Sequence, residues 1–283
     1  MANTLSSDLI VDILSEVSIT TLGPVLGIMD SFTTDLSADA VAPRSTFQVD
    51  CVTGGSTTLT NPDSFETGDS TVEARPVTGN HISQPFHVTA QQMNQGFRLK
   101  NLLAKNMQVF ANSLHDIIMT PVTEAVYGTA VLDKTLATFT AADLPTIWAA
   151  GKNLPQKNLI LEGSFYAKIM PTDTTKFNPA DQGAYGFDRI AYSNRFTAAG
   201  TDVVGFLADP NALLVASGVP VMDEDVTNAM VGQEQVTLSN GLTVQLNSWV
   251  STGTRAKWAS LDVILGAAVG DAAAGMVIEG GTD

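Results

Sequence analysis

LKNLLAKNMQVFANSLHDII, residues 99–118, repeats an apolar side chain every three or four positions. The repeating residues are Leu99, Leu103, Met107, Phe110, Leu114 and Ile117 or Ile118. This spacing gathers them on one stripe of an α-helix, which then packs against a core. At 1.5 Å per residue the helix is about 30 Å long. Pro121 ends it, because proline lacks the amide hydrogen and clashes with the preceding turn.

After this helix the pattern becomes mixed α/β. Thr140 and Asp143 form a capping pair for a helix that continues to residue 149. Asp209, as N-cap before Pro210, predicts a helix through Leu213 and Val215 that Gly218 ends. Further predicted elements are a helix after Ser164, strands over residues 159–161, 187–192, 261–265 and 276–278, and a hairpin with Asn240-Gly241 at its turn. We therefore expect an α+β fold.

Before the helix, Gly23 to Gly79 is rich in Thr, Ser, Asp, Gly and Pro, so little of it can be helical. The alternation of Phe47, Val49 and Cys51 predicts one limb of a hairpin. The second limb covers residues 71–77 and resumes over residues 82–88, which leaves residues 61–69 as a polar tip. Thr89 with Gln92 predicts a capped helical turn that Gly96 ends. A compact monomer rarely contains so long a segment with few apolar anchors unless the segment is functional or disordered, and the third possibility is that it packs on another subunit.

The N-terminal residues predict a short amphipathic helix with apolar positions from Leu9 to Val17. Its other face carries Asp8, Asp12 and Glu16 at four-residue steps, where like charges repel each other. Either this face is solvated or a basic partner relieves the repulsion.

Composition narrows the function classes. With 283 residues and 44% apolar content, the chain can bury a large core without disulfides. The formal net charge of −15 disfavours direct binding to DNA or RNA, which requires clustered Lys and Arg. Solubility, a basic protein partner or the containment of DNA without adhesion each account for the acidity. The single cysteine, Cys51, excludes an intrachain disulfide. We expect no membrane helix and no signal peptide.

Enzyme motifs are largely missing. Phosphate-binding loops, nucleophile elbows and the usual metal-binding patterns are not found. The three histidines, His81, His87 and His115, would form a catalytic or metal site only by converging in space. We expect neither enzymatic activity nor a cofactor. Arg98 and Lys100 at the start of the long helix oppose its dipole, so an intersubunit salt bridge is their expected role.

The order of elements resembles the major capsid proteins of tailed double-stranded DNA bacteriophages, which have the Hong Kong 97-type fold, and within them the podophage coat-protein branch. The resemblance rests on that order and on four segments spread over nearly the whole chain. They are DLIVDILSEV (8–17), GAYGFDRIAYSN (183–194), DPNALLVA (209–216) and LDVILGAA (261–268).

The resemblance implies five parts: an N-terminal arm (1–44), an extended β-hairpin loop (45–89), a peripheral domain with a long spine helix (90–127), an axial α/β domain (128–235), and strands that return through both domains (236–283). It also implies a function. Many copies would form hexamers and pentamers around a scaffolding protein, leave a vertex for a portal protein and enclose double-stranded DNA without sequence-specific binding, with a decoration protein as an optional partner and no membrane. The location would be the virion, assembled in the bacterial cytoplasm. Subunit-interface residues on this hypothesis are Asp8, Asp12, Glu16, Phe65, Glu66, Arg75, Arg98 and Lys100.

Two alternatives remain at this stage. A phage tail-tube or other β-rich virion subunit would share the acidity and the absence of catalytic motifs, although the long helix argues against it. A cytosolic α/β hydrolase-like enzyme would need a carboxylate cluster in a deep pocket.

Overall fold

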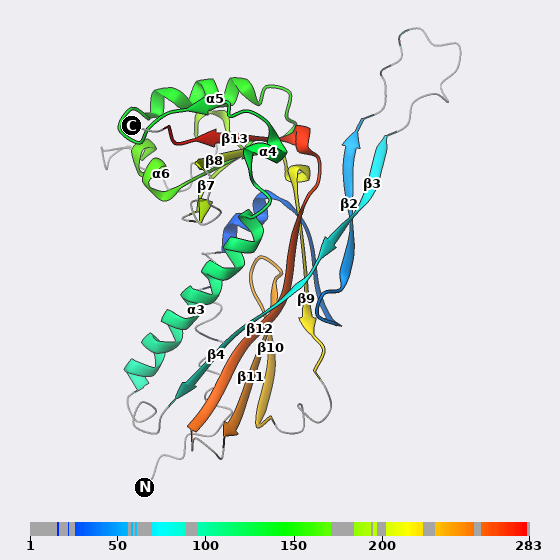
Figure 1. Ribbon diagram of the computed structural model, residues 1–283, viewed down its shortest axis with the longest axis vertical. Helices are drawn as coiled ribbons and strands as arrows, with labels where there is room; N and C mark the ends of the chain where they lie inside the picture. The colour runs from blue at the N-terminus through cyan, green and yellow to red at the C-terminus, as the bar shows by residue number, and fades with distance from the viewer. Residues whose placement is uncertain are drawn as a thin grey trace.

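The computed structural model describes residues 16, 22, 26–55, 58, 60, 70–88, 96–170, 184–193, 195–196, 202–222, 230–251 and 256–281. Two sheets follow each other along the long axis of the molecule, and a two-stranded hairpin projects from their side (Figure 1). We call the part around the smaller sheet the upper lobe and the part around the larger sheet the body.

The body is built on a six-stranded sheet in which the longest strand, β12, contacts three others. The strands are β1 (Thr33–Val41), β4 (Asn80–Val88), β9 (Leu213–Pro220), β10 (Gly232–Thr237), β11 (Thr243–Ser251) and β12 (Ala256–Val269). β12 pairs antiparallel with β4, with β11 and with β9. β1 pairs parallel with β9 at one end of the sheet, and β10 pairs with β11 at the other.

The long helix α3 (Gly96–Met119) lies against this sheet, as its sequence predicts (Figure 1). Leu103, Met107, Phe110, Leu114 and Ile118 are fully buried and share a core with alternate residues of β11 and β12. The helix has 24 residues, or about 36 Å at 1.5 Å per residue. It ends two residues before Pro121, which confirms the predicted stop.

The upper lobe contains a five-stranded sheet in the order β5-β13-β8-β6-β7. Its elements are β5 (Leu132–Asp133), β6 (Asn158–Leu161), β7 (Arg189–Tyr192), β8 (Val203–Ala208) and β13 (Gly275–Glu279), with helices α4 (Glu124–Tyr127), α5 (Leu144–Ala150) and α6 (Gly163–Ile169). A second core joins α5 and α6 to this sheet through Leu144, Ile147, Phe165 and Leu207. The α+β prediction is confirmed.

Two arginines tie the upper lobe to the body. On β7, Arg189 donates to Gly27 O at 2.7 Å and lies 3.1 Å from Asp30 in the 3₁₀ turn η1 (Leu26–Ser31). Arg195 Nε donates to Asp116 Oδ1 of α3 at 2.7 Å. These charge-assisted hydrogen bonds fix the angle between the two parts more strongly than neutral ones would.

Most predicted elements are confirmed. Thr140 and Asp143 form a complete capping box at η2 (Ala141–Asp143), directly before α5. Gly241 adopts the positive φ of 87° that the Asn-Gly turn between β10 and β11 demands. The helix predicted after Ser164 is α6, but its N-cap is Glu162, which accepts from Ser164 N.

The helix predicted from Asp209 to Gly218 is wrong. Asp209 does cap a turn, by accepting from Asn211 N at 3.1 Å, but that turn, η5, covers only Pro210–Ala212. The chain then becomes β9, all of whose residues are buried between β1 and β12. A continuous apolar run suits a strand covered on both faces, and here tertiary burial outweighs the local helix start.

Two predictions before α3 also need correction. Gly96 begins α3 and does not end a turn, while the predicted Thr89–Gln92 cap lies outside the described residues. Residues 26–41 do find partners within their own chain: Leu26, Met29 and Phe32 enter the main core, and β1 pairs with β9. The expectation that the whole segment from Gly23 to Gly79 lacks such partners is therefore wrong for its first part.

Asp143 supplies a pH-dependent contribution to stability. Burial alone would raise the pKa of its carboxyl, but hydrogen bonds from Lys134 Nζ and Thr140 N and the lysine charge lower it overall. A lowered pKa means that the stabilisation is complete above the pKa of the unfolded chain and is lost as pH falls through the pKa of the folded state. We expect Asp143→Asn to cost about 1–2 kcal/mol near neutral pH, and the difference from wild type to vanish in acid.

Urea unfolding of the wild-type protein and of Asp143→Asn, from about pH 7 to pH 3, measures this difference in the free energy of unfolding. Asp35→Asn on exposed β1 is the control and should stay within about 0.5 kcal/mol of wild type. A difference that grows on acidification would contradict the assignment.

Candidate assembly interface

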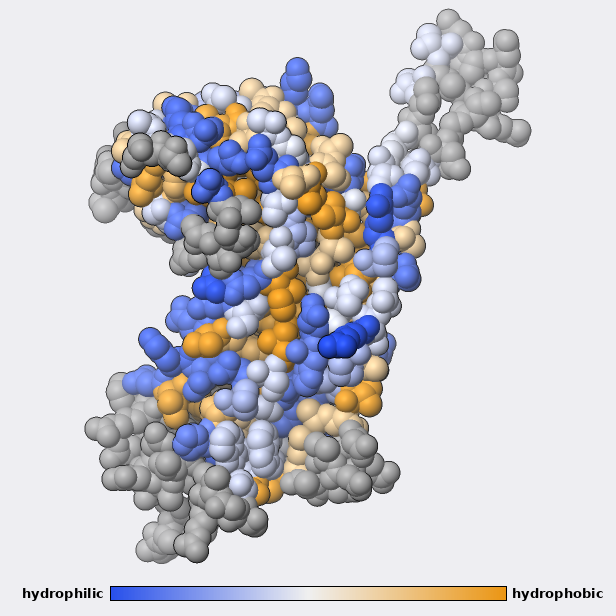
Figure 2. Space-filling model, viewed as in Figure 1, coloured by the Kyte–Doolittle hydropathy of each residue, from blue (hydrophilic) through white to orange (hydrophobic). Residues whose placement is uncertain are grey.

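The hairpin that leaves the body consists of β2 (Thr46–Gly54) and β3 (Thr71–Thr78). Its antiparallel ladder runs from Thr46 opposite Thr78 to Gly54 opposite Thr71 and forms a sheet of its own. The body, by contrast, is several strands wide, so the hairpin stands out as a narrow projection (Figures 1 and 2). A hairpin of two strands is marginal by itself in water, which favours packing against something else.

In the described part of the hairpin, one face packs against its own chain from the base as far as Cys51. Val49, Cys51 and Val77 are buried with Leu214 and Ala216 of β9. Cys51 Sγ donates to Asn211 O at 3.6 Å, and burial, assisted by Asp271, raises the pKa of the thiol. The hairpin limbs predicted over Phe47–Cys51 and residues 71–77 are confirmed as β2 and β3. The prediction that the second limb resumes over residues 82–88 is wrong, because these residues belong to β4 and pair with β12 in the body sheet.

The opposite face of the hairpin is exposed along its whole length. It carries Val52 opposite Val72, Asp50 opposite Ala74, and Gln48 opposite Pro76. Val52 and Val72 are 49% and 56% exposed, so a cross-strand apolar pair faces solvent. Exposed apolar side chains that are contiguous on a strand surface are typical of a contact with a partner.

The hairpin is attached rigidly at Gly79. This residue joins β3 to β4, donates to Ser45 O at 2.9 Å and accepts from Arg44 N at 3.0 Å. A Cβ at position 79 would lie 2.5 Å from Ile264 and 2.7 Å from Phe47, so only glycine lets the chain pass here. These contacts set the path of the chain where the hairpin joins the body.

The structure describes part of the predicted interface set. Asp8, Asp12, Phe65 and Glu66 lie outside the described residues, as does the predicted polar tip at 61–69. Glu16 is exposed. Arg98 and Lys100 fall in the first turns of α3, but their side chains are not among those described.

Arg75 lies on β3 of the hairpin, and its guanidinium contacts Glu73 Oε2 at 2.7 Å. Both side chains are about half exposed, so the pair contributes little to stability and stays accessible to a partner. Glu73, Val52 and Val72 were not among the residues predicted from the sequence, although the alternation that places Val49 and Cys51 inward also places Val52 outward.

The three histidines do not converge. His81 and His87 lie on β4, whereas His115 is buried on α3. His81 Nε2 lies 3.2 Å from Asp262 Oδ1, and the buried Asp262 also accepts from Asn247 Nδ2 at 2.7 Å. This network satisfies a carboxylate inside the sheet. Among the residues that the structure describes, no three His, Cys, Asp or Glu side chains form a metal-binding group.

No helix in the described part of the chain has the length and apolarity needed to span a membrane. No family model and no curated protein matches the sequence.

Solved structures do match over most of the chain. A virus-like particle from Pyrococcus furiosus has a TM-score of 0.55 at 13% identity, with 95% of this chain and 98% of that chain covered. A structure of Mycobacterium phage Bobi has a TM-score of 0.52 at 14% identity, covering 90% and 89%. The capsid of Ralstonia phage GP4 has a TM-score of 0.51 at 10% identity, covering 89% and 88%. The chain therefore has the Hong Kong 97-type fold of phage major capsid proteins.

Proposed function

We propose that this chain is a major capsid protein that assembles into an icosahedral head around phage double-stranded DNA. The observation that supports this proposal is the hairpin, which projects from the side of the body (Figure 1) and has an exposed outer face with the apolar pair Val52 and Val72. Laid across a neighbouring copy, it would bury this surface and its unpaired strand edges. Two of the matching structures, a virus-like particle and a phage capsid, support the same function.

The partners follow from that role. Many copies would form hexamers and pentamers, with a scaffolding protein during assembly, a portal protein at one vertex and, in some particles, a decoration protein. The site of action would be the virion, assembled in the bacterial cytoplasm. A net charge of −15 suits a wall that encloses DNA without adhering to it. The role is structural and needs no catalytic centre and no cofactor.

Electron microscopy of the purified protein, expressed with and without any scaffolding protein encoded beside it, tests the function. Closed shells of uniform diameter are expected. Tubes or stacked rings would support the tail-tube alternative, and small monodisperse particles under every condition would contradict an assembly role.

A further inference from the structure

The five-stranded sheet of the upper lobe ends in two strands with an open side. β7 and β5 are its terminal strands, and in the described part of the chain no strand pairs with the outer side of either. Terminal strands of this kind are places where another chain can dock. The two ends differ sharply in the side chains that they carry.

The β7 end is aromatic. Tyr192 on β7 is 57% exposed, and Tyr185, just before β7, is 53% exposed. Tyr185 also adopts a positive φ of 63°, a strained conformation for a bulky residue. Trp148 of α5, 39% exposed, donates to Gly186 O at 2.8 Å and so holds this turn in place. Exposed, fixed aromatic side chains are characteristic of protein contacts.

Lysines surround these aromatic residues. Lys157 Nζ lies 5.3 Å from the centre of the Trp148 ring, and Lys152 follows Trp148 by four residues and is exposed. The carboxylate of Asp188 also lies at this end, and a hydrogen bond from a backbone amide leaves its negative charge in place. Asp188 accepts from Lys157 N at 2.7 Å, and the neighbouring Arg189 is paired with Asp30. Lys157 Nζ donates to Leu154 O at 3.1 Å, and among the described residues no carboxylate forms an ion pair with the ammonium of Lys152 or Lys157.

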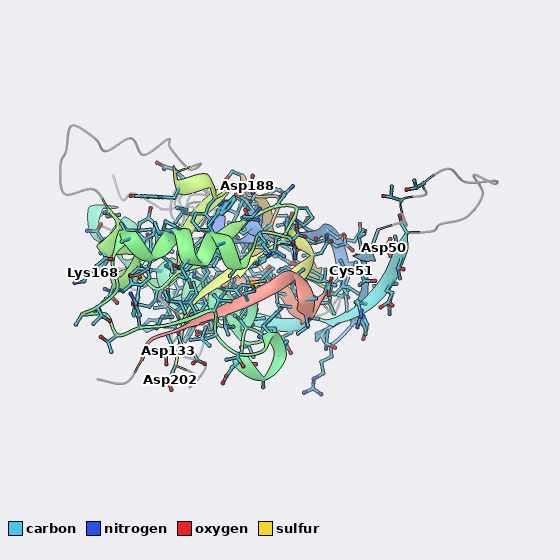
Figure 3. The ribbon with its side chains drawn as sticks, turned by 90° about the horizontal axis from the view of Figure 1, so that it is seen from above. Asp50, Cys51, Asp133, Lys168, Asp188 and Asp202 are labelled. Atoms are coloured by element: carbon cyan, nitrogen blue, oxygen red, sulfur yellow. The ribbon has the colours of Figure 1, made fainter. Side chains whose placement is uncertain are left out.

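The β5 end is acidic. Asp133 on β5 lies opposite Glu279 on β13, with Glu124 and Asp202 nearby. Burial raises the pKa of Glu279, and the charges of Glu124, Asp133 and Asp202 raise it further, so these carboxylates are close together. Lys134 does not neutralise them, because its ammonium contacts Asp143. Figure 3 shows Asp133 and Asp202 on one side of the lobe and Asp188 on the opposite side.

We propose that the aromatic and lysine-bearing β7 end of one upper lobe docks on the carboxylate-bearing β5 end of the lobe in a second copy of this chain. The two ends lie at opposite sides of one sheet, so they cannot meet within one molecule. Contact between two different surfaces of identical copies is head-to-tail and closes into a ring when the rotation permits. The inference rests on the proposed capsid function and identifies the chemistry that joins neighbouring lobes.

Exchanging the charges tests the contact in the full chain. One variant carries Lys152→Glu with Lys157→Glu, a second carries Asp133→Lys with Asp202→Lys, and a third carries all four changes. Each of the first two should reduce the assembled fraction at least tenfold, measured by sedimentation, because like charges then face each other. The third should recover to within about threefold of wild type, since the attraction is restored with opposite sign.

Two further variants make the result specific. Lys168→Glu on α6 is the matched control, because Lys168 lies away from both sides of the lobe in Figure 3, and it should assemble as wild type does. Tyr192→Ser should lose assembly while the thermal unfolding of the free subunit is unchanged.

Each outcome separates the two proposals. Two results would overturn the contact between lobes and leave the capsid function intact, provided that the wild-type protein forms shells. One is normal assembly of both double variants. The other is a quadruple variant whose assembled fraction is no higher than that of either double variant. Wild-type protein that never assembles would overturn both.

Discussion

A chain in which residues 53–71 are replaced by Asn-Gly is expected to fold normally and to form no shells. The replacement joins Val52 to Val72, which already face each other in the ladder, through a turn that suits two antiparallel strands. The buried base, Val49, Cys51 and Val77, keeps its contacts with β9. The free subunit should therefore unfold as wild type does, within about 0.5 kcal/mol.

Assembly should fail because the removed segment supplies, on our account, the reach to an adjacent copy. Sedimentation and electron microscopy measure the loss. A milder variant, Val52→Thr with Val72→Thr, keeps the full hairpin and removes only the exposed apolar pair, so it should weaken assembly without abolishing it. Normal shells from the shortened chain would refute the role given to the hairpin.

Phe206→Ala is expected to destabilise the subunit by about 3–5 kcal/mol. Phe206 on β8 is fully buried, and its ring lies 4.7 Å from that of Tyr127 and 6.3 Å from that of Phe32. Phe206 and Tyr127 come from β8 and α4 of the upper lobe, and Phe32 comes from the segment before β1, so the cavity opens where the lobe meets the body. A loss of this size is a large share of the free energy of unfolding of a native protein, which is usually about 5–15 kcal/mol.

Urea unfolding at a protein concentration too low for assembly measures the loss. Val109→Ala on α3 is the control, since Val109 is 48% exposed and should change stability by less than about 0.5 kcal/mol. A loss below about 1 kcal/mol for Phe206→Ala would show that the two parts are not joined through this core.

The sequence predicts elements well where the pattern is local. Helix α3 follows from a stripe of apolar residues sustained over six turns, the α5 start from the Thr140–Asp143 spacing, and the β10–β11 turn from Asn240-Gly241. In each case the deciding contacts are a few residues apart.

Prediction failed where the deciding contact is remote. β9 reads locally as a helix start, and only burial between β1 and β12 makes it a strand. β1 has few large apolar side chains, and Leu214, the partner of its first residue Thr33, stands far along the chain. The residues proposed for the contact between upper lobes are visible in the sequence. Their position at the two ends of one sheet, on β7 and β5, is not, because strand order is a property of the whole fold.

The most direct test of the account is a cryo-electron microscopy reconstruction of the assembled particle that locates residues 46–54 and 71–78. We expect a closed shell in which the exposed face of each hairpin, with Val52 and Val72, lies on the body of an adjacent copy. A reconstruction in which every hairpin contacts only its own subunit, or particles that are not closed shells, would contradict it.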